Sequence, residues 1–188
     1  KIIRQTTSNA VLDFDNWDID FLTDYILHVH HRYLKKALPE IKEQTTKFLE
    51  EHRKKFPELG ELENIIDPFI KEIPPHMQRE EEIFFPYIKQ IHHAHKHRES
   101  YAKLLIRTLR KPIEEVMLKE HEATGSNLNR LRMITNNYIP PHKACITHKV
   151  TFAKLKELDN DLVQHIHLES NILFPKAIKM EQELLQDK

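Results

Sequence analysis

Apolar residues along most of this chain recur every three or four positions, the spacing that places them on one face of an α-helix. The pattern is clearest in two segments, which share inward positions at offsets of 0, 4, 7, 11 and 14 residues. These positions are Phe69, Ile73, His76, Glu80 and Ile83 in one segment and Leu158, Leu162, His165, Glu169 and Ile172 in the other. We therefore expect two core-facing helical stripes, each with one imidazole and one carboxylate.

The two stripes carry the same motif, in which His is followed after three residues by Glu and after four more by Phe-Pro. It begins at His76 and again at His165. Residues four apart on a helix lie on the same face, so each His and its Glu point inward together. An ionised Glu in an apolar stripe is costly unless it is paired or binds a metal. Two such helices facing each other would bring two His and two Glu together.

The periodicity predicts helices over residues 18–39, 40–56, 62–91, 100–110 and 113–135, and a last long helix after residue 145. The helix over residues 18–39 should bend or restart at Leu38-Pro39, and the helix over residues 62–91 should kink at Pro74-Pro75. A proline inside a helix removes a hydrogen bond. We expect an extended lead-in over residues 1–15, a bundle over 16–180 and a tail over 181–188. The predicted fold is an all-α, up-down four-helix bundle with short extra helices.

Composition agrees with one compact helical domain, because 188 residues with 39% hydrophobic side chains and only two Gly suit a sizeable helical core. The formal net charge is zero, so neither a nucleic acid nor an anionic membrane is expected as a partner. The apolar runs are too short for a membrane span or a signal peptide. A single Cys excludes an intrachain disulfide and fits a reducing compartment. We expect a soluble cytoplasmic protein, and a start at Lys1 rather than Met fits a fragment.

The chain has 14 His, and a few of them occupy apolar stripes. In the helix predicted over residues 113–135, which is the third long helix of the bundle, His121 shares a stripe with Met117, Leu128 and Leu131. Gly125 follows His121 by one turn. A helical Gly costs about 1 kcal/mol relative to Ala, which suggests that space is needed there.

The first helix offers His28, His30 and His31, and periodicity barely separates the last two. The dense tract His92–His97 follows the expected helix end and is flanked by cations, so a solvated segment is a better interpretation than a dedicated site.

Four helices that supply four His and two Glu predict a dinuclear metal site in the bundle core, with each Glu able to bridge two ions. Two imidazoles per metal favour Fe or Zn, and Zn rarely needs twin carboxylate bridges. We therefore expect non-haem di-iron. Cys145 is most simply a small buried residue at the start of the last helix, because Lys143 and His148 alone make a weak case for a reactive thiol.

These residues resemble the hemerythrin-like di-iron proteins, and within them the iron-sulfur cluster repair proteins, also called repair of iron centres proteins. The resemblance covers residues 15–178. Its motifs are His-His-Arg-Tyr followed by Leu-Pro in the first helix, both His-x3-Glu-x4-Phe-Pro copies, Glu-His-Glu-Ala-x-Gly ending at Gly125, and Asn-Asn-x-x-Pro-Pro-x-x-Ala-Cys ending at Cys145.

The resemblance implies a ligand set of His31, His76, Glu80, His121, His165 and Glu169, with the distance to Leu38-Pro39 selecting His31. Oxygen-carrying hemerythrins place a second His four residues after the third-helix His, where this chain has Gly125. The missing ligand implies an open coordination position on one iron.

The resemblance also implies a function, the repair of iron-sulfur clusters damaged by nitrosative or oxidative stress, through iron donation or nitric oxide chemistry at the di-iron site. The implied partners are damaged iron-sulfur proteins and nitric oxide or oxygen. Alternatives are an oxygen or nitric oxide carrier or sensor and a nitric oxide reductase, so whether the protein is an enzyme stays open. Many members carry a small N-terminal domain with paired Cys, and nothing like it precedes Asp15.

Overall fold

Four long helices make up most of the computed structural model, which describes residues 12–109 and 113–186. Three of these helices are continuous but contain a π-helical segment. Their parts are α1 (Ile19–Tyr25), η2 (Ile26–His31) and α2 (Arg32–His52); α3 (Glu61–Arg79), η4 (Glu80–Phe84) and α4 (Phe85–His97); α6 (Ile113–Ile134); and α7 (Ile146–His167), η5 (Leu168–Leu173) and α8 (Phe174–Gln186). Shorter elements are η1 (Phe14–Asn16), η3 (Pro57–Gly60) and α5 (Ala102–Leu109). The described ranges contain no β-strand.

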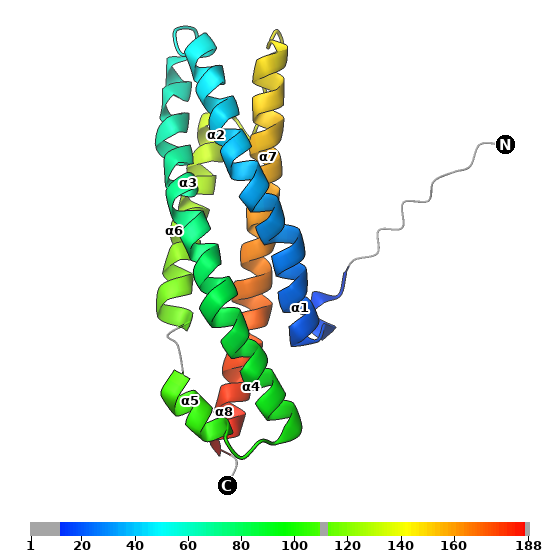
Figure 1. Cartoon of the computed structure of the whole chain (residues 1–188). Coiled ribbons are helices and arrows are strands. Elements are labelled where there is room, and N and C mark those ends of the chain that lie inside the picture. The colour runs from blue at the N-terminus through cyan, green and yellow to red at the C-terminus, as the bar shows by residue number, and fades with distance from the viewer. Residues whose placement is uncertain (1–11, 110–112, 187–188) are drawn as a thin grey trace, which may run out of the picture.

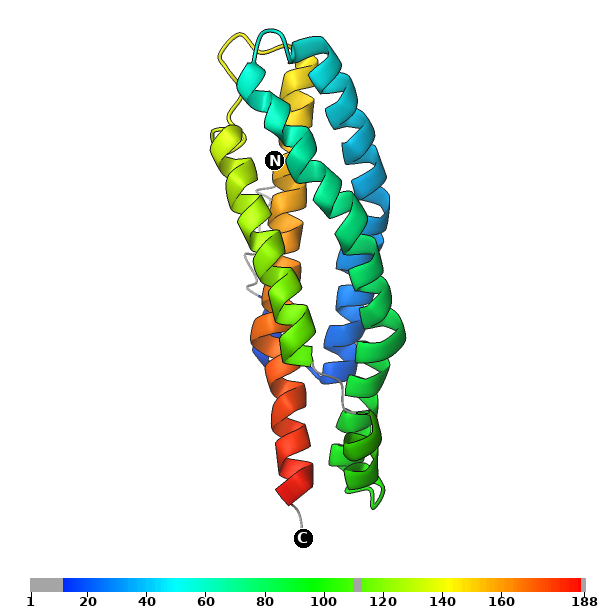
Figure 2. The same ribbon diagram turned by 90° about the vertical axis from the view of Figure 1, so that its left-hand side faces the viewer.

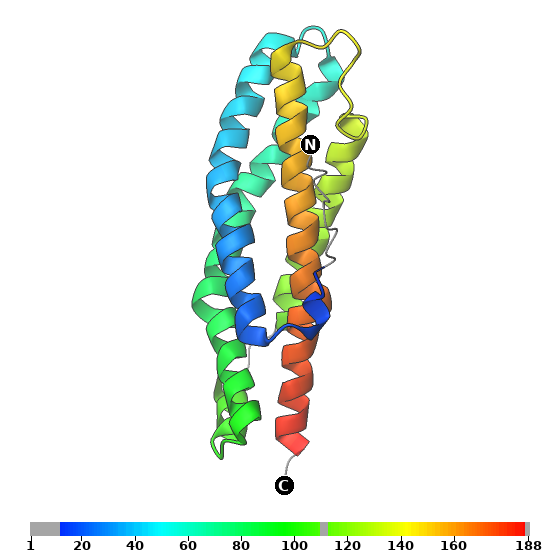
Figure 3. The ribbon, with the colours of Figure 1, turned by 90° about the vertical axis from the view of Figure 1, so that its right-hand side faces the viewer.

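Successive long helices run in opposite directions around the bundle (Figures 1, 2 and 3). Helix α2 packs against α3 and α7, α3 packs against α6, and α4 packs against α8. The short helix α5 covers α4 and α8 at one end of the bundle. The prediction of an all-α, up-down four-helix bundle with short extra helices is confirmed.

Several predicted helix boundaries differ from the structure. The first helix continues through Pro39 to His52 without a restart, and the second runs through Pro74 and Pro75 and on to His97. The tract His92–His97 is therefore helical rather than a segment beyond the helix end. Helix α8 extends to Gln186, past the predicted bundle limit. Residues 1–11 of the predicted lead-in lie outside the described part of the chain.

Local capping explains where helices begin and end. Asp18 precedes α1 and its Oδ1 accepts the backbone N–H of Asp20 at 3.0 Å, which satisfies one free donor of the first turn. Arg98 ends α4 in the left-handed region with φ of 52°. Between α6 and α7, Asn136, Asn137 and Tyr138 all have positive φ, a conformation that Asn tolerates better than most residues.

The bundle interior consists of two apolar clusters with a polar layer between them. One cluster gathers residues of α1, α4, α5 and α8, among them Phe85, together with Ile26 of η2 and Met117 of α6. The other cluster gathers residues of α2, α3, α6 and α7, including Phe48 and Leu128. Every long helix passes from one cluster to the other. The segments that cross between the clusters carry the inward-facing His and Glu residues.

The π-helical segments change one prediction. Ile83 was expected to face inward, but its exposed fraction is 41%, whereas that of Phe84 is 5%. A π-helical turn holds an additional residue, so the inward stripe after Glu80 moves by one position. In the second motif copy Ile172 is buried as expected, with an exposed fraction of 4%.

Across the described residues, no helix combines the length and apolar character that crossing a membrane requires.

Candidate metal centre

All six side chains predicted as ligands meet in the polar layer. His31 ends the π-helical segment η2, His76 and Glu80 lie on either side of the junction of α3 and η4, and His121 projects from the middle of α6. His165 and Glu169 occupy the corresponding junction of α7 and η5. The six are buried, and the exposed fraction of both carboxylates is 0%.

Glu169 reaches towards two different imidazoles with its two oxygens. Its Oε1 lies 2.9 Å from Nε2 of His165, and its Oε2 lies 3.3 Å from Nε2 of His121. A carboxylate with one oxygen in each half of a site has the orientation needed to bridge two ions. Glu169 therefore divides the layer into two halves.

Glu80 faces the layer in the same way. Its Oε2 lies 3.4 Å from Nε2 of His31, and its Oε1 lies 3.2 Å from Nε2 of His76. Both oxygens of Glu80 and Oε2 of Glu169 are buried and have no hydrogen-bond partner among the described residues. Buried carboxylate oxygens are normally satisfied, and a cation between these oxygens would supply the missing partner.

The imidazoles form two pairs. The Nε2 atoms of His31 and His165 lie 3.2 Å apart, and so do those of His76 and His121. Ligand atoms about 2.1 Å from one ion are separated by about 3.0 to 3.4 Å in octahedral or tetrahedral arrangements. Each pair together with the two carboxylates therefore fits one ion, giving two groups of four donors that share the two Glu residues.

The electrostatics of the layer favour positive charge. Burial alone would lower the pKa of His31, but the carboxylates of Glu169 and Glu80 outweigh it and raise that pKa to about 10. The pKa of His76 is raised to about 9 by Glu80, Glu169 and Glu120 against the same effect of burial. For Glu169, burial would raise the pKa, but the surrounding imidazoles hold it well below its usual range.

Two of the imidazoles are oriented by carboxylates outside the layer. Nδ1–H of His31 donates to Oε1 of Glu81 at 2.8 Å, and Lys35 pairs with the other oxygen of Glu81 at 2.8 Å. These bonds hold a proton on Nδ1, so Nε2 is the nitrogen that would bind a metal once its own proton is displaced.

His76 has the same arrangement in the other half. Its Nδ1–H donates to Oε2 of Glu120 at 2.6 Å, and Arg79 pairs with Glu120. Each half of the layer thus has one His held by a carboxylate that is itself paired with a cation.

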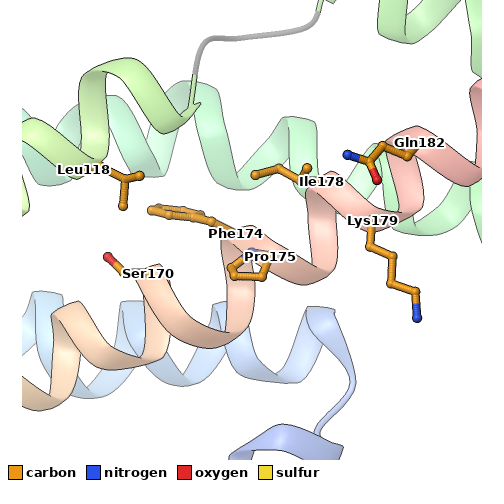
Figure 4. Close-up of a pocket in the computed structure, with 7 residues that line it drawn as sticks. All are labelled: Leu118, Ser170, Phe174, Pro175, Ile178, Lys179 and Gln182. Carbon is orange, nitrogen blue, oxygen red and sulfur yellow. The ribbon is translucent and has the colours of Figure 1, made fainter.

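His121 has a different outer partner. Its Nδ1–H donates to the hydroxyl oxygen of Ser170 at 2.7 Å, and its ring stacks on Phe174 with centroids 6.1 Å apart. Ser170 and Phe174 line a pocket of about 270 Å³ together with Leu118 and residues of α8 (Figure 4). A neutral hydroxyl polarises the imidazole less than a carboxylate does.

A second pocket is lined by His121 itself. It has a volume of about 350 Å³, and its lining includes His121, Gly125, Val163 and His167. A Cβ atom at Gly125 would meet nothing within 4 Å. The glycine therefore leaves open space one turn from His121, as the sequence suggested.

The structure separates the candidates on the first helix. His28 is exposed, whereas His30 and His31 are both buried. His30 lies outside the layer: its ring stacks on that of His165 with centroids 5.6 Å apart, and its Nδ1 lies 2.9 Å from Oδ1 of Asp161. Only His31 faces the two carboxylates. Periodicity alone did not distinguish the two, because each shares a stripe with apolar residues: His30 with Ile19 and Ile26, and His31 with Leu27 and Leu34.

Sequence reasoning missed the outer partners Glu81, Glu120 and Ser170. All three are sequence neighbours of ligands, since Glu81 follows Glu80, Glu120 precedes His121 and Ser170 follows Glu169. A polar residue beside a buried one on a helix was the available signal, but it also describes any amphipathic helix. The pairing across helices became visible only in the structure.

The tract His92–His97 lies apart from the layer. The ring nitrogens of His92 lie 3.6 Å from Asp18 and Asp20, and Nε2 of His95 lies 2.6 Å from Glu183. His93 is exposed. That this tract is not a dedicated metal site remains a prediction.

Cys145 differs from the expectation of a buried residue. It is exposed and caps the first turn of α7. The helix begins with residue 146, so the side chain of Cys145 lies outside the packed interior.

A four-helix bundle with a buried layer of His and Glu is the architecture of a cation-binding helical domain. The family model described as "Hemerythrin HHE cation binding domain" matches residues 22–177, and this chain belongs to that family. The iron-sulfur cluster repair protein YtfE of Edwardsiella ictaluri is 33% identical over 173 residues, which are 92% of this chain and 72% of that protein. The protein of the same name from Escherichia coli O81 is 36% identical over 160 residues, 85% of this chain and 66% of that protein. This chain is therefore similar to most, but not all, of each relative.

The outer carboxylates give the first testable prediction. Glu81→Gln or Glu120→Gln removes the negative charge that supports an imidazole ligand, and we expect each to weaken metal affinity about tenfold. Competition with a chromophoric chelator measures this affinity. The matched control is Glu82→Gln, because Glu82 lies exposed in the same π-helical segment as Glu81 and accepts a hydrogen bond from Gln78 rather than from an imidazole. Equal affinities in all three variants would contradict the role of the outer carboxylates.

Proposed function

We propose that His31, His76, Glu80, His121, His165 and Glu169 hold two non-haem iron ions, with Glu80 and Glu169 as bridges. The observation that carries this proposal is the division of each carboxylate between two imidazole pairs, at distances of 2.9 to 3.4 Å. The family's description as cation-binding supports a metal. Two imidazoles per ion and two shared carboxylates suit iron better than zinc, which usually sits alone with four ligands.

We further propose that the chain takes part in repairing iron-sulfur clusters damaged by nitrosative or oxidative stress. Relatives that cover most of this chain carry the name iron-sulfur cluster repair protein. Bound iron would supply either the metal for a depleted cluster or a place where nitric oxide binds. The expected partners are damaged iron-sulfur proteins and nitric oxide or oxygen, and the expected compartment is the cytoplasm.

The residues of the layer suit controlled release of a metal. Each ion would be held by two neutral imidazoles and two shared carboxylates. The two carboxylates stay in the layer when one ion leaves, and they can still hold the other ion. The imidazole protons stay on the Nδ1 atoms of His31 and His76, where Glu81 and Glu120 accept them. The half with His121 borders a pocket that His121 itself lines, which makes it the easier half to open.

The open space beside Gly125 favours a second candidate function, reversible binding of a diatomic molecule. In a helix, residue 125 lies one turn beyond residue 121, within reach of the same ion. With glycine there, a small external ligand has room next to His121. A carrier or sensor would bind oxygen or nitric oxide reversibly without repairing any cluster.

Reactivation of a damaged enzyme tests the repair function. Protein loaded with Fe(II) is incubated without oxygen with an iron-sulfur enzyme whose cluster has been nitrosylated, and recovery of that enzyme's activity is measured. We expect recovery with the loaded protein and little with metal-free protein or with His121→Ala. His93→Ala is the matched control, because His93 is exposed and remote from the layer, and it should retain both iron and repair. Equal recovery with metal-free protein would contradict the proposal.

Gly125→His tests the open position. The new imidazole would fill the space beside His121, so we expect slower iron loss to a chelator and weaker binding of azide or nitric oxide. Chelator-driven release and azide titration measure both effects, and replacing Gly adds about 1 kcal/mol of helix propensity, which helps the variant to fold. Unchanged release and unchanged azide affinity in a folded, iron-loaded variant would show that the glycine does not keep the site open.

A further inference from the structure

The single cysteine of the chain lies beside a histidine at the end of the bundle away from α5. Cys145 precedes α7, and His52 is the last residue of α2 (Figures 1 and 3). His52 lies 21 residues along the helix from His31, which corresponds to about 30 Å at 1.5 Å per residue. This cluster is therefore separate from the metal centre.

His52 is positioned as a base for the thiol. Its Nε2 lies 3.0 Å from Sγ of Cys145, and its Nδ1–H donates to the backbone carbonyl oxygen of Phe48 at 2.9 Å. Because a carbonyl oxygen can only accept a hydrogen bond, Nδ1 carries the proton, and Nε2 is free to take the thiol proton. A nucleophile, a base and a group that orients the base are the elements of an activated cysteine.

The start of α7 stabilises negative charge on the same sulfur. The backbone N–H of His148 donates to Sγ at 3.4 Å, and α7 is a helix of 22 residues with its positive end at Cys145. The pKa of the Cys145 thiol is lowered, first by this backbone N–H and then by His52. An exposed thiol in an electropositive setting matches the surroundings of reactive cysteines.

Aromatic rings hold His52 in place. Its ring stacks on that of Phe48 with centroids 4.6 Å apart and on that of Phe56 with centroids 6.4 Å apart. His148 packs edge to face against it, with centroids 5.8 Å apart and an interplanar angle of 67°. The base is thus confined between packed rings.

His148 is the second unusual feature of this cluster. Its exposed fraction is 1%, and neither ring nitrogen has a hydrogen-bond partner among the described residues. Burial, together with the neighbouring His52 and Lys55, lowers its pKa, which favours the neutral ring. The neutral imidazole packed against His52 thus has one donor and one acceptor without a partner among the described residues.

We propose that Cys145 is a nucleophilic thiol, activated by His52, that forms a mixed disulfide with low-molecular-weight disulfides. The thiol proton moves from Sγ to Nε2 of His52, and the thiolate attacks one sulfur of the incoming disulfide. The new S–S bond forms as the old one breaks, and the electron pair leaves with the second sulfur, which takes the proton from His52. The incoming disulfide is the only oxidant required. The chain has no second cysteine, so the adduct persists until another thiol removes it.

This proposal does not depend on the metal centre, and the single cysteine makes it directly measurable. Every thiol reaction of the chain occurs at Cys145. The probes are glutathione disulfide, with adduct formation followed by intact mass, and iodoacetamide, with the alkylation rate followed across pH. Cys145→Ser is the blank in both assays.

We expect the alkylation rate of the native protein to reach half its maximum at a pH below the value of about 8.5 that is usual for a free thiol. His52→Gln should raise this midpoint by about one pH unit. It should slow adduct formation at neutral pH only about threefold, because a smaller fraction of the thiol is ionised but each thiolate is more nucleophilic. His142→Gln is the matched control, since His142 is exposed three residues before Cys145, and it should change neither quantity.

Other charged groups near the dyad are Glu51, whose carboxylate lies 3.8 Å from Nδ1 of His52, and Lys55, which acts on His148. Glu51→Gln should therefore shift the midpoint less than His52→Gln does. If His52→Gln does not fold, the pH midpoint of alkylation is compared between the native protein and the same chain unfolded in urea. A lower midpoint in the native protein would then support activation of the thiol by the fold. A midpoint of about 8.5 in both states, or equal midpoints in the native protein and folded His52→Gln, would overturn the proposal.

Discussion

Two ionised carboxylates at the centre of an apolar bundle are the constraint on which this structure depends. Glu80 and Glu169 have exposed fractions of 0% and face the same buried layer. Removing such a group from water costs several kcal/mol after relaxation, and only nearby positive charge offsets that cost. Four imidazoles and the ions they would hold supply it, while the apolar clusters on both sides of the layer exclude water. The two halves nevertheless differ. Each half has one imidazole supported by an outer carboxylate, His31 by Glu81 and His76 by Glu120, but only in the second half does a described pocket include a ligand, His121, in its lining.

The helices reach this arrangement by departing locally from α-helical geometry. Of the three π-helical segments, η2 ends at His31, η4 begins at Glu80, and η5 begins one residue before Glu169. Such segments are rare and occur mostly at functional sites, because the wider turn redirects a side chain without breaking the helix. The clusters on either side then resume regular packing. The site and the helix irregularities are thus one feature of the chain.

Because helical periodicity is a local property, it predicted the bundle and five members of the polar layer, while the choice of His31 came from the resemblance to the family. Spacing of four residues was enough to pair His76 with Glu80 and His165 with Glu169. Periodicity failed at Ile83, because a π-helical turn shifts the stripe and leaves no simple trace in the order of apolar residues. It did not separate His30 from His31, since each lies on a stripe of apolar residues. It also missed the setting of Cys145, because His52 lies 93 residues away and only the packing of α2 against α7 brings the two together.

The central claim is that the polar layer holds two ions shared by Glu80 and Glu169. Titration of metal-free protein with Fe(II) under anaerobic conditions, followed by removal of free iron and elemental analysis, tests it most directly. The two groups of four donors predict a plateau at two iron ions per chain. A stable plateau at one iron per chain, or no retained iron in a folded protein, would contradict the account.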